Sequence, residues 1–376
     1  MTKPFKVAIV GAGPAGLYFA YCLKRKRPDA EIQVFETSTA DATWGFGVVF
    51  SAQALEFLAD DDPATVAAIA PQMETWKDIT IFHRGEKVVI DGIGFSAIGR
   101  LRLLKLLQAR AASVGVVPRF EHSIDSLAEL GAADLIVAAD GLNSVVRRAR
   151  EAEFGASISY LDNRFAWYGT TKVFPTLSHT FVAEGDDVYN AHHYRFSPTM
   201  STFLVETDAL TFKRRGFDRK SELETRRELE RLFADTLEGH ALVDNRSIWR
   251  QFPWLTNERW YAGNCVLLGD ALHTAHFSIG SGTRLALEDV TALIDALVAA
   301  DYDVARALPA YQAAREPILA KLVAAAHRSA NWYEHFRDHM ALAPKDFAMS
   351  YITRSGRIPP ERLRAMSPRF ATLFES

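Results

Sequence analysis

Cysteine is scarce in this chain, which has only Cys22 and Cys265 among its 376 residues. Both lie inside apolar stretches, so we expect them to be buried thiols and not a disulfide pair. A small secreted domain held together by disulfides is therefore excluded. The composition is typical of a protein that works in a reducing compartment.

Long hydrophobic runs and a strong net charge are also missing. No uninterrupted apolar run reaches the length of about eighteen residues expected of a membrane helix. The opening segment, Met1–Lys6, leads directly into the first predicted strand and leaves no room for a signal peptide. A formal net charge of −3 creates no field that would favour nucleic acid. We therefore expect a cytoplasmic protein with neither a membrane nor a nucleic-acid partner.

The chain does contain enough apolar sequence for a large core. Hydrophobic residues make up 48% of it and charged residues 24%, which is typical of a folded globular protein. Its length of 376 residues is large for one domain and indicates two closely joined ones.

The N-terminal segment carries a glycine pattern in a specific context. An apolar run breaks into Gly11, Gly13 and Gly16, a helical stretch follows, and a second apolar run ends on Glu36. This strand, glycine turn, helix and acidic strand end together form the fingerprint of a dinucleotide-binding site.

Each residue of the fingerprint has a physical role. Gly11 allows a sharp turn, Gly13 lets the backbone approach a pyrophosphate, and Gly16 lets the helix pack close to the strand. The helix N-terminus offers free N–H groups to the phosphates. Glu36 can accept hydrogen bonds from both ribose hydroxyls but would repel a 2′-phosphate, so the site suits FAD or NAD and not NADP.

Hydrophobic periodicity predicts the remaining elements. Apolar residues at intervals of three and four indicate helices, whereas the alternation of aromatic or β-branched residues with polar ones between about 160 and 260 indicates an antiparallel sheet. The predicted helices cover 101–113, 220–237, 283–300 and 309–341, and the predicted buried strands cover 134–139 and 265–268.

Two more motifs follow predicted buried strands. One strand ends on Asp140 and Gly141, and a later one ends on Gly269 and Asp270. An Asp-Gly pair alone is only a turn signal. Asp270 at such a strand end could bind a ribityl hydroxyl.

In this order and spacing, the three motifs resemble those of the single-component flavoprotein aromatic hydroxylases, the family of 4-hydroxybenzoate hydroxylase. The resemblance covers nearly the whole chain. It implies an α/β fold in which a Rossmann-like FAD-binding domain is interrupted by an antiparallel β-sheet substrate domain and followed by a helical C-terminus. It also implies tightly bound FAD, transiently bound NADH or NADPH, O₂ as cosubstrate, and no metal.

The expected domains are discontinuous. The FAD-binding domain would comprise 1–75, 96–155 and 260–300. The substrate-binding sheet domain would comprise 76–95 and 156–259, and the C-terminal helical region would comprise 301–376.

The cofactor residues are matched to the family motifs position by position. Phe46, Val48 and Val49 are expected to line the flavin, and Arg100 matches the arginine that reaches its side. The full set is Gly11, Gly13, Ala15, Gly16, Glu36, Phe46, Val48, Val49, Arg100, Asp140, Gly141, Gly269, Asp270, Gly280, Gly282 and Thr283.

The chain departs from the family pattern at two positions near the flavin. Phe277 stands where many members have proline, and Arg284 stands where many have asparagine. Together with the segments 44–50, 167–170, 200–203 and 276–283, these departures resemble a narrower branch. That branch contains the salicylyl-CoA 5-hydroxylases, the flavin half of 2-aminobenzoyl-CoA monooxygenase/reductase, and the tryptophan-derived hydroxylase of violacein biosynthesis.

Several polar and aromatic residues are candidates for contact with the substrate. The catalytic candidates are His276, His193 and Tyr168, since a histidine near the ring could accept a phenolic proton. Alternation along a strand means that at most one of His192 and His193 can face the substrate. The candidate substrate-binding residues are Phe50, Tyr194 and Phe277 at the ring, and Lys213, Arg214 and Arg215 for the phosphates of a CoA thioester.

The resemblance implies hydroxylation of an aromatic acyl-CoA, with salicylyl-CoA to gentisyl-CoA as the leading hypothesis, through a flavin C4a-hydroperoxide. One alternative is a hydroxylase of a free aromatic or indolic metabolite. Others are a flavin-dependent dehydrogenase or reductase on the same fold, and a non-catalytic flavin-binding subunit. The choice between NADH and NADPH, and between a monomer and a homodimer, stays open.

Overall fold

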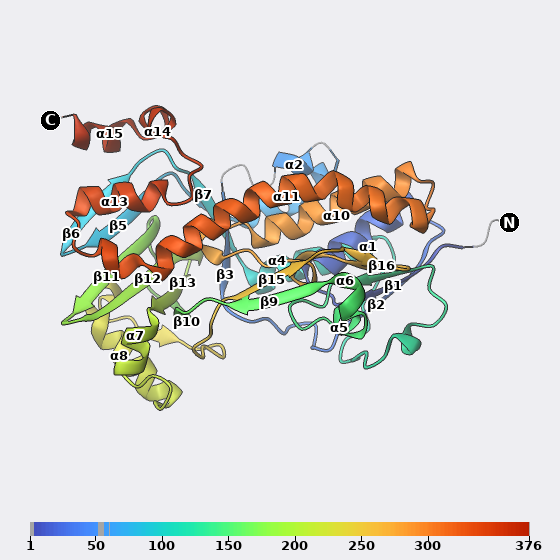
Figure 1. Ribbon diagram of the computed structural model, residues 1–376, viewed down its shortest axis with the longest axis horizontal. Coiled ribbons are helices and arrows are strands. Elements are labelled where there is room, and N and C mark those ends of the chain that lie inside the picture. Colours follow the sequence, from blue (N-terminus) through green and yellow to red (C-terminus); the bar gives the residue numbers. More distant parts are fainter. Residues whose placement is uncertain (1–3, 52–55, 60, 376) are drawn as a thin grey trace.

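Two β-sheets lie next to each other in the molecule, and the longest helix, α11 (Val304–Glu334), runs past both of them (Figure 1). The computed structural model describes residues 4–51, 56–59 and 61–375. The chain passes from the first sheet to the second and back, and it ends in a set of helices.

The first sheet has five strands in the order β16-β17-β8-β1-β2, and its four longer strands are parallel. Parallel strands covered on both faces are continuously apolar. This explains why the buried runs were predictable from the sequence. The strands are β1 (Lys6–Val10), β2 (Glu31–Phe35), β8 (Leu135–Ala138), β16 (Tyr261–Ala262) and β17 (Cys265–Leu267).

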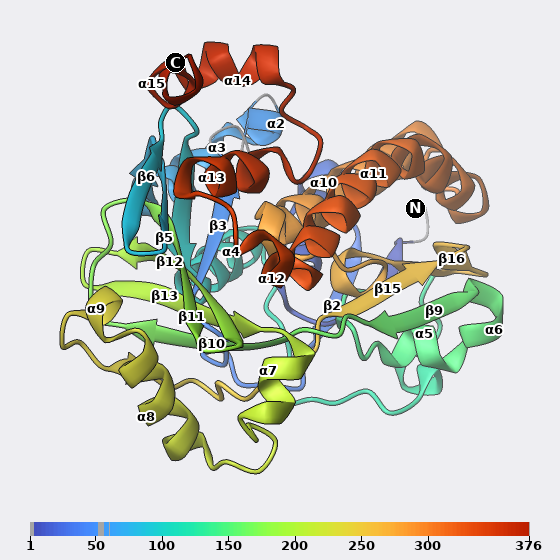
Figure 2. The same cartoon turned by 60° about the vertical axis from the view of Figure 1, so that its left-hand side comes forward.

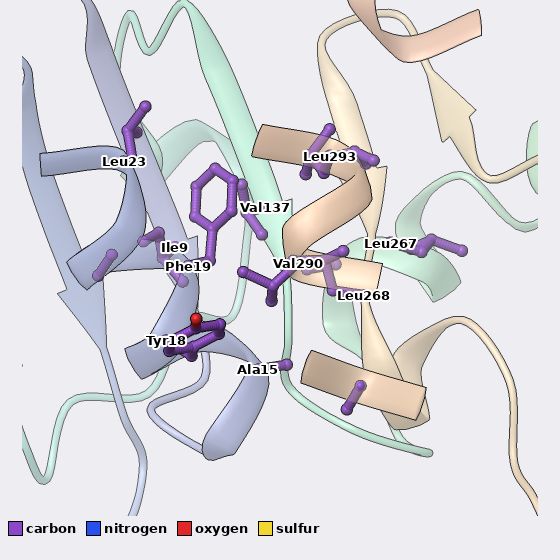
Figure 3. Close-up of a cluster of buried hydrophobic side chains, with 14 of the residues drawn as sticks. Ile9, Ala15, Tyr18, Phe19, Leu23, Val137, Leu267, Leu268, Val290 and Leu293 are labelled. Carbon is purple, nitrogen blue, oxygen red and sulfur yellow. The ribbon is translucent and has the colours of Figure 1, made fainter. Parts of the chain in front are cut away.

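Helices α1 (Pro14–Lys26) and α10 (Gly282–Ala299) pack against this sheet and against each other. Phe19 and Val290 are fully buried between the helices and the strands, next to Val137 (Figure 3). Helix α4 (Arg100–Ser113) packs beside α1. This core holds the glycine turn after β1 in a fixed position.

The second sheet has seven strands in the order β14-β10-β13-β12-β11-β5-β6. All neighbouring pairs are antiparallel except β11 with β5, so the predicted antiparallel sheet is confirmed. The strands are β5 (Ile79–His83), β6 (Glu86–Ile90), β10 (Arg164–Thr170), β11 (Leu177–Glu184), β12 (Asp187–Ser197), β13 (Met200–Thr207) and β14 (Leu242–Val243).

The seven-stranded sheet is covered on both faces. Helices α7 (Ala209–Arg214) and α8 (Glu222–Leu232) lie on one side of it, and the end of α11 with α13 (Pro344–Thr353) lies on the other (Figure 2). Successive residues of each strand therefore enter two different cores. The register decides which side chains face the end of α11 and α13 and which face α8.

Two smaller sheets connect the larger ones. The three-stranded sheet has the order β3-β7-β4, and the two-stranded one pairs β15 with β9. Their strands are β3 (Gly47–Ser51), β4 (Glu74–Trp76), β7 (Phe95–Gly99), β9 (Ala156–Tyr160) and β15 (Pro253–Asn257). Strand β3 carries the segment that was predicted to line the flavin.

The predicted helices are confirmed, with two of them divided. The helix expected over 220–237 is α8 followed by α9 (Ala234–Leu237), and the one expected over 309–341 is α11 followed by α12 (Phe336–His339). The other α-helices are α2 (Glu56–Ala59), α3 (Pro63–Ile69), α5 (Val145–Ala149), α6 (Glu151–Phe154), α14 (Pro360–Met366) and α15 (Pro368–Ala371).

Both cysteines are free, as predicted, but only Cys265 is fully buried, whereas Cys22 is partly exposed. Within the described ranges, no helix combines the length and apolar character needed to cross a bilayer. Among the same residues, no three histidine, cysteine or acidic side chains gather closely enough to hold a metal ion. The domain boundaries given above stay a prediction.

Candidate functional site

A cavity of about 660 Å³ lies at the carboxyl ends of the parallel strands. Gly11, Glu36, Asp140 and Gly269 line it, and each comes one or two residues after the end of β1, β2, β8 or β17. This is where ligands bind in open parallel sheets. The cavity continues to the seven-stranded sheet, so residues of both sheets form its wall.

The glycine turn has the geometry that the sequence predicts. Gly11 has a φ of +99°, and a Cβ there would lie 2.3 Å from the carbonyl oxygen of Ala139. A Cβ on Gly16 would lie 2.0 Å from the carbonyl oxygen of Gly11, so Gly16 supports the turn from behind and does not line the cavity. A Cβ on Gly13 would meet nothing within 4 Å, which leaves the start of α1 open to a pyrophosphate.

Glu36 lies beside this turn. Its Oε2 accepts a hydrogen bond of 2.9 Å from the backbone N–H of Ala12, and its Oε1 accepts one of 2.9 Å from Ser38. Thr37 Oγ1 also donates a hydrogen bond of 3.3 Å to Oε1. These bonds hold the carboxylate against the cavity wall, and Oε2 keeps a second lone pair for a ribose hydroxyl.

Three charged groups face the cavity with unused polar atoms. Asp140 accepts a 2.7 Å hydrogen bond from Val145 N–H through Oδ2, but its buried Oδ1 has no partner in the described part of the chain. The buried Nε of Arg100 is also unpartnered there. Asp270 is exposed to the cavity, and desolvation raises its pKa while His273 and Arg100 oppose this rise.

These observations fit FAD. Buried polar atoms without partners are rare in folded proteins unless a ligand or water satisfies them. The open cradle at Gly13, the carboxylate of Glu36 and the aspartate after β17 match the pyrophosphate, ribose and ribityl groups in kind. Val48, Val49, Gly280, Gly282 and Thr283 also line the cavity. Ala15 and Gly141 line it as well.

Phe46 does not line the cavity. Its ring packs on Gly169, where a Cβ would lie 2.5 Å away, and it approaches Phe196 with a centroid distance of 6.4 Å. Phe50 is fully buried in the core beneath β3. Phe46 and Phe50 thus fill the core on either side of the Val48 and Val49 segment that does reach the cavity.

The cavity-facing side of the seven-stranded sheet presents five side chains. Cross-strand pairing puts Trp167 next to Leu204 and Leu204 next to His192, and it pairs Tyr194 with Thr202. The hydroxyl of Tyr194 donates a 2.9 Å hydrogen bond to the carbonyl of Gly47, which joins the sheet to β3.

Two of these five side chains, Trp167 and His192, have a buried nitrogen without a hydrogen-bond partner among the described residues. The ring of His192 stacks on His179 at 4.3 Å, and the unpartnered nitrogen of His192 is its Nε2. Burial, with the nearby charge of Arg354, lowers the pKa of His192 to about 3. The imidazole is therefore neutral at physiological pH.

The structure corrects the catalytic assignments of His193 and Tyr168. His193 follows His192 in β12 and points to the opposite face, where its Nε2 lies 2.9 Å from Thr180 Oγ1 and its ring stacks on Phe203. Tyr168 belongs to the same core against α8. Neither lines the cavity, because a strand turns successive side chains to opposite faces.

His276 is also placed outside the cavity lining. Its Nδ1 lies 2.8 Å from Ser278 Oγ, and its ring packs against Phe252 and Tyr333. Its neighbour Phe277 lines the cavity instead, and its role in binding the substrate stays a prediction. The aromatic side chain of this segment that reaches the cavity is therefore Phe277, one position after the predicted His276.

The cluster Lys213, Arg214 and Arg215 lies on α7, away from the cavity. Arg214 pairs with Asp187 at 2.8 Å, and Arg215 pairs with Glu184 and Asp187. These carboxylates neutralise the two guanidiniums. The three cations are adjacent in the sequence, whereas these acidic partners come from β11 and β12, so the sequence alone did not reveal the pairing.

A dinucleotide cradle that shares one cavity with an aromatic, histidine-bearing sheet face defines a flavin-dependent oxidoreductase. Residues 96–326 match the family described as FAD binding domain, and residues 9–40 match the family described as NAD(P)-binding Rossmann-like domain. The chain belongs to the FAD-dependent aromatic monooxygenases. It uses FAD, NAD(P)H and O₂.

The chain is similar to three named relatives. It is 41% identical to salicyloyl-CoA 5-hydroxylase of Streptomyces sp over 93% of this chain and 70% of the relative. It is 38% identical to 3-hydroxy-4-methyl-anthranilyl-[aryl-carrier protein] 5-monooxygenase of Streptosporangium sibiricum, over 89% and 90%. It is 32% identical to protodeoxyviolaceinate monooxygenase of Chromobacterium violaceum, over 94% and 96%.

Solved structures show the same fold at low sequence identity. The Pseudomonas aeruginosa PqsL structure aligns with a TM-score of 0.70 at 22% identity, covering 90% of this chain and 99% of that one. The expected fold, a Rossmann-like domain interrupted by an antiparallel sheet, is thereby confirmed.

Proposed function

We propose that this protein hydroxylates the ring of an aromatic acyl-CoA, with salicylyl-CoA to gentisyl-CoA as the specific reaction. The observation that carries the proposal is the single cavity that joins the FAD cradle to the unpartnered Nε2 of His192. A hydroxylated or aminated ring placed there would satisfy this buried atom. The similarity to salicyloyl-CoA 5-hydroxylase supports the thioester class.

FAD supplies the oxygen-activating chemistry when bound. The protein holds the aromatic ring of the substrate at a fixed distance from the flavin and excludes water from the site. Tyr194 and Thr202 are buried side chains of the cavity wall, and Phe277, whose ring lies 5.1 Å from that of Phe165, lines the cavity as well.

His192 acts in this proposal as a positioning residue. A pKa of about 3 makes its imidazole a weak base, so full removal of a phenolic proton at pH 7 is uphill. A neutral Nε2 can still accept a hydrogen bond from a ring hydroxyl or amino group, and this bond orients the ring and increases its electron density. Removal of the bond should lower the yield of product per NAD(P)H oxidised.

A second cavity offers a place for the phosphates of the CoA arm. It has a volume of about 520 Å³ and is lined by Arg328, Arg354, Asn331, Trp332 and three histidines, His327, His335 and His339. No carboxylate of the described residues lies within ion-pair distance of Arg328 or Arg354. Arg354 also donates a 2.8 Å hydrogen bond to the carbonyl of Ser278, the residue after Phe277, so one short segment separates the two cavities.

The test compares substrate-stimulated NAD(P)H oxidation and product yield with salicylyl-CoA, anthraniloyl-CoA and the two free acids. We expect strong stimulation by a CoA ester and little by the free acids. Stimulation by the free acids alone would contradict the thioester assignment while leaving the monooxygenase class untouched.

A matched pair of variants tests the place of the phosphates. Arg328→Glu should raise the KM for the CoA ester about tenfold by the loss of a charge-assisted contact, with kcat retained. Lys321→Glu, an exposed cation two turns earlier on α11, should leave KM unchanged. Equal effects of the two variants would exclude the second cavity as the phosphate site.

A further inference from the structure

Trp44 lies at the mouth of the main cavity. It is one of the residues lining the cavity, yet 46% of its surface is exposed. The guanidinium of Arg246 lies 4.1 Å from the ring centroid of Trp44, and that of Arg250 lies 5.8 Å from it. An exposed indole between two arginines therefore marks the entrance to the flavin site.

This arrangement is held in place by the backbone. Asn245 donates hydrogen bonds from Nδ2 to the carbonyls of Thr43 and Gly45, at 3.2 and 2.8 Å. Gly45, with a φ of +72°, packs so tightly on Trp167 that a Cβ would lie 2.8 Å from its ring. Trp44 is thus fixed between the loop that carries Arg246 and the cavity wall.

The two arginines are exposed and free of ion pairs. No carboxylate in the described ranges comes within ion-pair distance of Arg246 or Arg250, whereas Arg214 has Asp187 at 2.8 Å. Asp244 is the acidic residue of the same loop, and its Oδ1 accepts a 2.8 Å hydrogen bond from Ser247 N–H. Two unpaired guanidiniums suit an anion with two neighbouring phosphates.

We propose that Trp44, Arg246 and Arg250 form the docking site of the nicotinamide dinucleotide that reduces the flavin. A base of the dinucleotide stacks on the indole, and its pyrophosphate lies against the guanidiniums. The hydride must pass from the nicotinamide to FAD, so its donor has to reach this cavity from solvent. The chain has no second glycine fingerprint, and side chains at the mouth therefore have to supply the recognition.

The experiment separates the reductive half of the reaction from the rest. Oxidised holoenzyme is mixed anaerobically with NADH or NADPH, and flavin reduction is followed by absorbance. Arg246→Glu and Arg250→Glu should each raise the apparent Kd about tenfold, because a favourable contact with the pyrophosphate becomes a repulsive one. Trp44→Ala should raise the apparent Kd by a smaller factor, and Trp44→Phe, which keeps a ring for stacking, should raise it less than Trp44→Ala does. Lys213→Glu, an exposed cation on α7, is the matched control and should leave Kd unchanged.

Two readouts make the site independent of turnover. Calorimetric titration of the oxidised holoenzyme with NAD⁺ should show the same loss of affinity. Enzyme variants reduced chemically with dithionite and then given O₂ and substrate should form product as the unsubstituted enzyme does, with unchanged FAD content.

The proposal is overturned if Arg246→Glu and Arg250→Glu leave the dinucleotide Kd unchanged. A raised KM for the acyl-CoA with normal flavin reduction would instead assign this surface to the substrate. Loss of FAD from both arginine variants and from Arg246→Gln would overturn it too, since the arginines would then support the flavin site itself. The dinucleotide Kd and the FAD content do not depend on the thioester being the substrate.

Discussion

The two faces of the seven-stranded sheet show how differently neighbouring residues of one strand can be used. On the face toward α8, His193 bonds Thr180 and stacks on Phe203, whose ring is fully buried. On the cavity face, the Nε2 of His192 has no partner within the described part of the protein. The face toward α8 also holds buried atoms without partners among the described residues, the Nδ1 of His193 and the hydroxyl of Tyr168, but neither residue lines the cavity, whereas His192 does and can meet a ligand there.

The same face of the sheet carries further polar atoms without partners two residues before His192 along β12. Asn190 is paired directly with Glu206 across β12 and β13. Both polar atoms of Asn190 and the Oε2 of Glu206 are buried without partners among the described residues. Neither Asn190 nor Glu206 lines the cavity. The comparison teaches that contact with the cavity, more than residue type or hydrogen-bond satisfaction, distinguishes the binding face from the packing face.

The largest expected effect is on the packing face. Phe203→Ala should lower the free energy of unfolding by about 3–5 kcal/mol, since it deletes a buried ring from the core against α8. Chemical denaturation measures this loss. The fraction that stays folded should retain its product yield per NAD(P)H, and a fall in that yield would show that the two faces are coupled.

Glu206→Gln should change the pH dependence of stability. Burial raises the pKa of Glu206 from 4.5 to about 8, and the charge of Glu334 adds to the rise while Asn163 opposes it. Stability is then greatest below pH 4.5, where both states are protonated, and falls as pH rises to about 8 because only the unfolded state ionises freely.

The variant removes this penalty, so its free energy of unfolding should exceed that of the unsubstituted protein by a margin that grows between these pH values. Denaturation at a series of pH values tests this. The control is Glu222→Gln, an exposed carboxyl at the start of α8. Parallel pH profiles for Glu206→Gln and the unsubstituted protein would show that Glu206 ionises normally.

A paired substitution tests the functional half of the comparison. His192→Phe should lower product formed per NAD(P)H about tenfold, a change of about 1.4 kcal/mol, while His192→Gln should recover part of it by restoring a polar partner. His193→Phe should leave the ratio unchanged. Equal losses from both histidines would mean that the effect is structural.

The smallest expected effect comes from Tyr168→Phe. The buried hydroxyl of Tyr168 has no hydrogen-bond partner among the described residues, and burial raises its pKa. Removing it should change the free energy of unfolding by less than about 1 kcal/mol and leave catalysis as it was. A marked loss of activity would return Tyr168 to the list of catalytic candidates.

The cofactor site was largely predictable because its determinants are local. The glycines, Glu36, Asp140 and Asp270 each follow a buried strand in the sequence, and parallel strands bring their carboxyl ends to one edge. The sequence pattern therefore predicts both the motif and the edge of the sheet at which its residues lie. The roles of these residues in binding FAD stay predictions, supported by where they lie.

The substrate side was less predictable because its determinants are not local. Whether His192 or His193 faces the cavity depends on which side of the sheet α8 covers, and alternation alone states only that the two differ. The Asp187 and Glu184 partners of the basic cluster come from strands whose pairing fixes their positions. Trp44 gave no periodic signal and became meaningful only when Arg246, two hundred residues later, was found beside it.

The sequence by itself determined the class of the protein. Glycine turns and buried parallel strands leave signatures within some thirty residues, because steric and hydrophobic requirements act on the chain locally. The tertiary structure alone decided which side chains reach the cavity, which charges are neutralised and where the cavity opens. Those properties depend on strand register and on contacts between segments far apart in the chain, and no local pattern records them.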